Sequence, residues 1–167
     1  VNAKENDPDY FLGPILLVFQ ELQGDLTKYL VIDGQQRLTT MGLCLAALRD
    51  ECRALESSWE SGLHDLVVRI NIAGHRTHFI LNPQEPDAEN YKNRVGEIGS
   101  TASPPPPLNK ESDLVAPGLD TIKMLLSSYL GEGADKKQKL ESLAEYIVDY
   151  VTLLPIDVGT EDRGHLI

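Results

Sequence analysis

Apolar and β-branched residues cluster in two short runs near the start of the chain, at residues 14–20 and 28–33. The segment between the runs contains Gly24 and Asp25, residue types that favour a turn. We therefore predict a β-hairpin. Its second strand runs through an Asp-Gly pair directly into a helical pattern.

That helical pattern has apolar residues at alternating spacings of three and four, namely Leu38, Met41, Leu45, Leu48, Cys52 and Leu55. This spacing predicts an amphipathic helix with one buried face and one solvated face. Similar patterns predict a helix from near Pro117 to Tyr129 and another over 140–150. We also expect 82–95 to begin as a loop and end as a short helix.

Three further segments have strand character. Residues 66–71 and 77–81 form a second predicted pair, with Ala73-Gly74 at the turn. Residues 151–158 are also strand-like, and Pro155 assigns them to a sheet edge or a bulge because proline cannot donate a ladder hydrogen bond. Strands and helices together indicate an α+β fold with a small mixed sheet.

Four consecutive prolines at 104–107 predict a stiff polyproline II segment that ends any regular element. We use this segment to divide the chain. The predicted organisation is a first domain at 1–100, a proline-rich linker at 101–116, and a helical appendage at 117–167 that ends in a strand. The first residue is not methionine, and we expect the chain to be a segment of a longer protein.

The junction between strand and helix carries the most informative residues. A helix begins with unsatisfied backbone N–H groups at the positive end of its dipole, so a cation there is unfavourable. Gln35, Gln36 and Arg37 nevertheless form the first turn. An anion held between Arg37 and the helix start would explain this arrangement, and Gly34 would let the backbone approach that anion closely.

A purely structural interpretation of the same residues remains open. Asp33 is placed to cap the helix with Gln36 as the returning partner of a capping box, and Asp33 and Arg37 have the spacing of an ion pair. Junctions of this kind are common, and short motifs match by chance. Spacing alone slightly favours this structural interpretation.

The charge balance limits the classes of partner. The net charge is −11 and the pI is near 4.7, which is the wrong sign for wrapping a nucleic-acid backbone. A local basic patch would have to use Arg37, Arg69, Arg76 or Arg94. We interpret all of these except Arg37 as solvated surface charges. Strong DNA binding by this chain alone is therefore disfavoured.

Cysteine and histidine suggest no metal or redox chemistry. Cys44 and Cys52 lie eight residues apart in one predicted helix, too far apart for a disulfide, and are interpreted as small core residues of a reduced protein. His75 and His78 would face opposite sides of an extended segment, so we interpret them as surface residues. The sequence has no signal-peptide pattern and no apolar run of about 18 residues, which predicts a soluble cytoplasmic protein without a membrane partner.

Two stretches of the chain are distinctive, FLGPILLVFQ at 11–20 and VIDGQQRLTTMGLCLAALRD at 31–50, with DGQQR the most specific part. They closely resemble the N-terminal domain of GmrSD-type restriction proteins, which are modification-dependent, type IV anti-phage systems. The resemblance continues more weakly through 75–94 and 142–158. It therefore covers most of the chain.

That family resembles a branch of the ParB/sulfiredoxin superfold, in which a Gly-x-x-Arg turn at a helix start holds nucleotide phosphates. The resemblance implies a strand-turn-helix core that binds a nucleoside triphosphate, whose hydrolysis controls DNA cleavage by an HNH-type nuclease domain. Sulfiredoxins have a catalytic cysteine directly after the glycine, where this chain has Gln35, so sulfinic acid reduction is not expected. ParB proteins usually carry charged residues where Gln35 and Gln36 stand, so nucleotide choice and metal arrangement cannot be transferred.

We therefore predict a nucleotide-binding, NTP-hydrolysing regulatory domain of a modification-dependent restriction endonuclease, with Mg²⁺ as cofactor and the nucleotide left open. Asp33 is the predicted catalytic and metal-binding carboxylate. The predicted nucleotide-binding residues are Gly34, Gln35, Gln36, Arg37 and Thr40. The expected partners are an HNH-type nuclease domain or subunit and, through the whole system, DNA, with homo-oligomerisation left open.

The alternative is a non-catalytic sensor or interaction module that binds nucleotide or a DNA phosphate and controls a partner nuclease. Recognition of a modified base ranks last, because it would need an aromatic-lined pocket and the aromatic residues are scattered.

Overall fold

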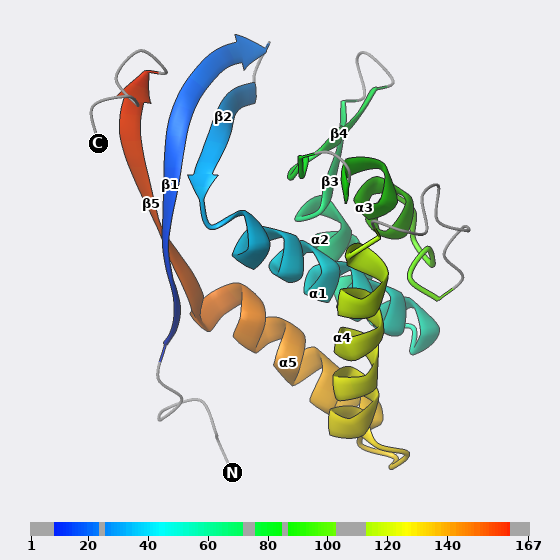
Figure 1. Ribbon diagram of the computed structural model, residues 1–167. Coiled ribbons are helices and arrows are strands. Elements are labelled where there is room, and N and C mark those ends of the chain that lie inside the picture. Colours follow the sequence, from blue (N-terminus) through cyan, green and yellow to red (C-terminus); the bar gives the residue numbers. More distant parts are fainter. Residues whose placement is uncertain (1–8, 24–25, 72–75, 85–86, 103–112, 161–167) are drawn as a thin grey trace. The chain divides into compact units, whose positions relative to one another are not determined.

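The structure is a computed structural model that describes residues 9–23, 26–71, 76–84, 87–102 and 113–160 (Figure 1). The predicted turns at 24–25 and 73–74, His75 and the prolines at 104–107 lie outside these residues. The described residues form two compact units, a sheet unit within 9–37 and 146–160 and a helical unit within 38–145.

The sheet unit contains three described strands, β1 (Tyr10–Gln23), β2 (Leu26–Asp33) and β5 (Val151–Thr160), in the order β2-β1-β5. Strand β1 is antiparallel to β2 and parallel to β5. The hairpin, the mixed sheet and the edge position of the strand that contains Pro155 are therefore confirmed. Figure 1 shows β1 between its two neighbours.

Apolar residues of β1 supply the buried part of this sheet. Ile15 and Val18 are buried, and Val18 is paired with Leu30 of β2. The neighbouring pair Phe19 and Tyr29 makes an edge-to-face ring contact with centroids 6.2 Å apart. Cross-strand apolar pairs of this kind fix strand register, because a one-residue slip would turn every side chain to the other face.

The helical unit contains most of α1 (Gln35–Ala54) and α5 (Lys136–Tyr150), together with three complete helices and a hairpin. These are α2 (Trp59–Asp65), α3 (Asp87–Val95), α4 (Val115–Leu130), β3 (Val68–Asn71) and β4 (Arg76–Phe79). The antiparallel hairpin and four of the five helices in the described part of the chain match the predictions. Helix α2 was not predicted, because seven residues are too few to show a clear periodicity.

The prediction that α1 has one buried and one solvated face is wrong. Every residue from Leu45 to Asp50 is buried, so the middle of the helix is enclosed on all sides. Small side chains allow this, because Ala46 and Ala47 let neighbouring elements approach closely. At Gly42 the approach is closer still, since a Cβ there would overlap the hydroxyl group of Tyr91 in α3.

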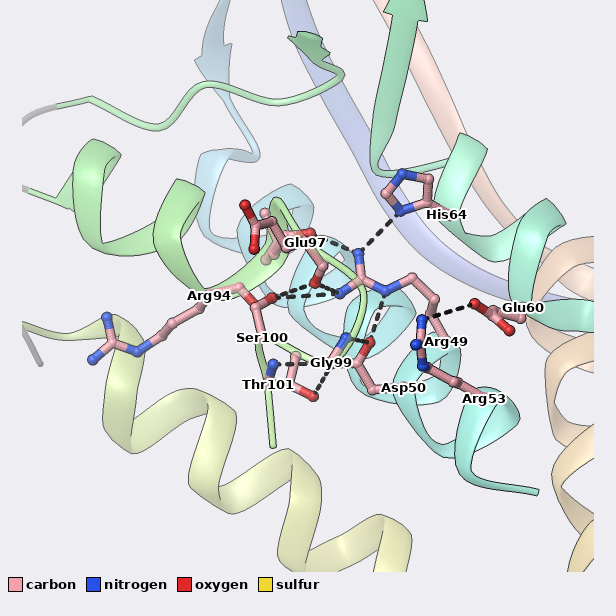
Figure 2. Close-up of polar contacts among 11 residues, drawn as sticks. Arg49, Asp50, Arg53, Glu60, His64, Arg94, Glu97, Gly99, Ser100 and Thr101 are labelled. Carbon is pink, nitrogen blue, oxygen red and sulfur yellow. Dashed lines mark hydrogen bonds and ion pairs between the residues drawn. The ribbon is translucent and has the colours of Figure 1, made fainter. Parts of the chain in front are cut away.

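A buried charge network joins α1 to the segment that follows α3 (Figure 2). The guanidinium of Arg49 is fully buried and donates to Asp50 Oδ1 at 2.8 Å. It also donates to the carbonyl oxygens of Val95 at 2.7 Å and Glu97 at 2.6 Å. Since His64 Nδ1 lies 3.3 Å from Arg49 Nη1 and arginine only donates, Nδ1 is the acceptor in this hydrogen bond.

Asp50 completes the network from the carboxylate side. It accepts hydrogen bonds from the backbone N–H groups of Gly99 at 2.8 Å and Thr101 at 2.9 Å, and also from the Thr101 hydroxyl. Burial raises the pKa of Asp50, but the hydrogen bonds from Arg49, Thr101 and Gly99 outweigh it and leave that pKa below its ordinary value. The charged carboxylate therefore pins the 99–101 loop to α1.

A second buried pair corrects the interpretation of Arg94 as a solvated charge. Arg94 and Asp113 are bonded at 2.6 Å, and their side chains are only 4% and 5% exposed. The second amino group of Arg94 donates to the Asn90 carbonyl at 3.1 Å. Burying this arginine is tolerable because a carboxylate from outside its own helix neutralises it.

Several remaining predictions can be compared with the structure. Cys52 is buried, Cys44 is half-buried, both are free thiols, and burial raises the pKa of each, that of Cys52 to about 11. No described helix is long and apolar enough to cross a membrane. The division into segments 1–100, 101–116 and 117–167 stays a prediction. The structure groups residues 146–160 with the first two strands and α4 with the helical unit.

Candidate functional site

The candidate site lies where β2 ends at Asp33 and α1 begins at Gln35. Gly34 joins the two elements with φ of +94°, a conformation that side chains rarely adopt. A Cβ at this position would also lie 2.6 Å from Cγ2 of Ile15 in β1. The turn therefore needs glycine for its backbone conformation and for its packing against the neighbouring strand.

Arg37 is held from two sides. Its Nη2 donates to Asp33 Oδ2 at 3.0 Å, which confirms the predicted ion pair, and its Nη1 lies 3.5 Å from the carbonyl oxygen of Leu12 in β1. The side chain of Arg37 is 33% exposed and that of Asp33 is 61% exposed. The guanidinium is thus oriented by the protein and still reaches solvent.

The predicted capping box is not formed, because no side-chain hydrogen bond joins Asp33 and Gln36 among the described contacts. The carboxylate of Asp33 accepts from Arg37 instead. Gln35 turns back to donate to the Val31 carbonyl at 2.8 Å, while Gln36 is exposed. The first turn of α1 contains no acidic residue.

An open hollow of about 510 Å³ covers the turn. Its lining residues are Ile32, Asp33, Gly34, Gln35, Gln36 and Arg37. They include five of the six predicted site residues. Thr40 is exposed one turn further along α1, and its role stays a prediction. The start of a 20-residue helix, a half-exposed guanidinium and open space together form an arrangement able to receive an anion.

The donor set near the turn offers one carboxylate for a metal ion. Within the described part of the chain, no group of three or more His, Cys, Asp or Glu side chains is placed to hold a metal. Mg²⁺ usually binds through one or two carboxylates plus substrate phosphates, and keeps several waters. Asp33 therefore fits a Mg²⁺ ion that arrives with a phosphate, while an all-protein metal centre does not fit here.

Two residues of the site were not identified from the sequence. The Leu12 carbonyl contacts Arg37, and Gly13 has φ of +107°, with a Cβ there falling 2.5 Å from Arg37 Nη1. A glycine inside an apolar strand run is the signal that could have found them, because it often marks a bulge or a close backbone approach. The pairing of β1 with β5 shifts register between Phe11 and Pro14, which surrounds this glycine.

A family described as "GmrSD restriction endonuclease, N-terminal domain" matches residues 2–162. The matched range contains both the Asp33–Arg37 turn and the Leu12–Gly13 segment. No curated protein matches the chain.

Proposed function

The chain belongs to the family of GmrSD restriction endonuclease N-terminal domains, and on that premise we propose that it binds a nucleoside triphosphate at the Asp33–Arg37 turn and thereby regulates a nuclease. Family membership supports a role in a restriction system together with a partner nuclease domain. The observation that carries the nucleotide proposal is the position of the Arg37 guanidinium, which is held in the first turn of α1 beside an open hollow.

The proposed phosphate contacts follow from the local geometry. The free N–H groups at the start of α1 and the helix dipole favour a negative ligand. Arginine has five N–H donors, and the contacts to Asp33 and Leu12 leave several of them for phosphate oxygens. Because the protein carries a net charge of −11, a small Mg²⁺-neutralised anion suits the surface better than a long DNA backbone.

The proposed role of Asp33 is to hold Mg²⁺ against the bound phosphates and to orient water. A bound Mg²⁺ supplies charge neutralisation for phosphoryl transfer. The carboxylate is exposed and next to the hollow, which are the properties that this role needs.

The first experiment is calorimetric titration of the domain with ATP, GTP, CTP and UTP in the presence of Mg²⁺. We expect saturable binding of at least one nucleotide by the wild-type protein and loss of that binding in Arg37→Ala. The matched control is Arg53→Ala, which removes another exposed, ion-paired arginine near the other end of α1. Failure of a folded wild-type protein to bind any of the four would refute the proposal.

The same observations leave a second candidate, a sensor that binds nucleotide or a DNA phosphate without hydrolysing it. This alternative is favoured because Asp33 is the one carboxylate among the described residues of the turn and already accepts a hydrogen bond from Arg37. It is therefore less available to hold Mg²⁺ or to orient water for hydrolysis. Asp33→Asn separates the two by measurement of phosphate release. An enzyme that uses Asp33 should lose hydrolysis and keep binding in this variant, whereas a pure sensor releases no phosphate even as wild type. Normal hydrolysis by Asp33→Asn would mean that Asp33 is not the catalytic carboxylate.

We propose an HNH-type nuclease as the regulated partner, with DNA contacted mainly through that partner. We also propose that copies of this chain can associate with one another. Both can be tested by sedimentation of the domain with and without nucleotide, alone and with the nuclease.

A further inference from the structure

Gly13 occupies an unusual position in β1. Its φ of +107° belongs to the region that favours glycine, and it lies inside an apolar run where a side chain would ordinarily be expected. The ladder to β5 is irregular on either side of it, between Phe11 and Pro14. The strand therefore has both a backbone conformation that suits glycine and a break in regular pairing at this residue.

The guanidinium of Arg37 occupies the space that a side chain at residue 13 would need. A Cβ on Gly13 would lie 2.5 Å from Arg37 Nη1 and 3.7 Å from its Cζ. The same Nη1 reaches the carbonyl oxygen of Leu12 at 3.5 Å. The guanidinium thus lies directly against the β1 backbone on one side, while Asp33 holds it on the other at 3.0 Å.

A Cβ at residue 13 would displace the guanidinium before it displaced the strand. The clashing atom is the far end of a flexible side chain, which moves more easily than backbone. By contrast, a Cβ at Gly34 would meet the Cγ2, Cβ and Cα atoms of Ile15, which include backbone and have less freedom to move. The two glycines therefore have different tasks. Gly34 shapes the turn itself, and Gly13 leaves room for Arg37.

We propose that Gly13 is a positioning residue of the phosphate site, whose missing side chain lets β1 fix the guanidinium of Arg37 in a phosphate-binding orientation. This inference rests on the proposed nucleotide-binding function. It extends the site from one turn to two segments, because a residue far from Arg37 in sequence sets where the guanidinium lies. Holding a flexible side chain in its binding geometry before the ligand arrives reduces the entropic cost of binding.

The test measures the affinity of three proteins, wild type, Gly13→Ala and Gly99→Ala, for a phosphate ligand in the presence of Mg²⁺. The ligands are ATP, GTP, CTP, UTP and inorganic tripolyphosphate. Gly99 also has a positive φ, +91°, but a Cβ there would meet nothing within 4 Å. Gly99→Ala therefore reproduces the backbone strain without displacing a guanidinium. We expect Gly13→Ala to weaken binding at least about tenfold, as for loss of one charge-assisted contact, while Gly99→Ala binds like wild type.

A second variant keeps the inference testable if Gly13→Ala does not fold. Asn tolerates positive φ better than Ala, so Gly13→Asn introduces a Cβ with less strain, and the same loss of binding is expected. An Arg37→Lys background provides a further check. Lysine keeps the charge but has no Nη1, so the effect of Gly13→Ala should shrink there, which a general destabilisation would not do.

The outcomes separate this inference from the proposed function. If wild type binds, Arg37→Ala does not, and folded Gly13→Ala and Gly13→Asn bind as wild type does, Gly13 is not a positioning residue and the nucleotide proposal stands. An undiminished Gly13→Ala effect in the Arg37→Lys background would also overturn the role of Gly13. Absence of binding by folded wild type would overturn both.

Discussion

Replacing Arg49 by methionine should destabilise the helical unit strongly, because it removes the centre of the buried charge network. The side chain of Arg49 is 0% exposed and that of Asp50 is 6% exposed. Methionine fills a similar volume but leaves Asp50 as a buried anion without its cation. It also leaves the carbonyl oxygens of Val95 and Glu97 without the donors that now lie at 2.7 and 2.6 Å.

The magnitude follows from comparing what is lost with what remains. Removing one partner of a buried ion pair costs about 3–5 kcal/mol. Asp50 keeps its hydrogen bonds from Gly99 and Thr101, which continue to stabilise the carboxylate, so we expect the lower end of that range, about 3 kcal/mol. The control Arg53→Met removes an exposed pair with Glu60 at 3.6 Å and should cost no more than about 1 kcal/mol.

The assay is urea denaturation followed by far-ultraviolet circular dichroism, which reports the helices of this unit. The free energy of unfolding of Arg49→Met should be lower than that of Arg53→Met by about 2 kcal/mol or more. Free energies of unfolding for the two variants that agree within about 0.5 kcal/mol would refute the reasoning, because Arg49 would then contribute no more than an exposed ion pair does. Such a result would mean that Arg49 is not a buried partner of Asp50 in solution.

Two further predictions concern the same unit. Gly42→Ala should destabilise it by about 1–3 kcal/mol, because the new methyl group overlaps the hydroxyl of Tyr91, whereas Gly62→Ala meets nothing within 4 Å and should stabilise α2 by about 0.5–1 kcal/mol. Thermal denaturation of both variants checks this, and equal shifts would contradict it. Burial and the charge of Arg49 lower the pKa of His64 below its ordinary 6.5, so the unfolded chain takes up this proton first. Neutral His64 therefore contributes to folding stability above pH 6.5, the pKa of the unfolded chain. That contribution is lost as the pH falls through the lower pKa of the folded state. His64→Asn, which retains an acceptor for Arg49, should flatten this part of the pH–stability profile, and an unchanged slope would contradict the assignment.

Local sequence was enough to locate the candidate site. The apolar run before Asp33, the glycine after it and the spacing of three and four along the following helix are all short-range patterns. Each follows from the geometry of a single element, so the hairpin, the start of α1 and the Asp33–Arg37 pair could be predicted. The contact of Arg37 with Leu12 and Gly13 could not. A glycine inside an apolar run can signal a close backbone approach, but nothing near Gly13 in sequence indicates that Arg37 is the residue that approaches.

The sequence by itself therefore determined most of the elements, with α2 the exception, and the tertiary structure decided what each polar residue does within them. The pattern favoured a solvated role for Arg94, gave no sign that Arg49 is fully buried, and left the partner of the last strand open. A charge can be buried only where groups distant in sequence, such as Asp113 for Arg94, neutralise it. Burial of charge and the pairing of distant strands depend on contacts between segments far apart in the chain, and periodicity within one segment carries no information about them.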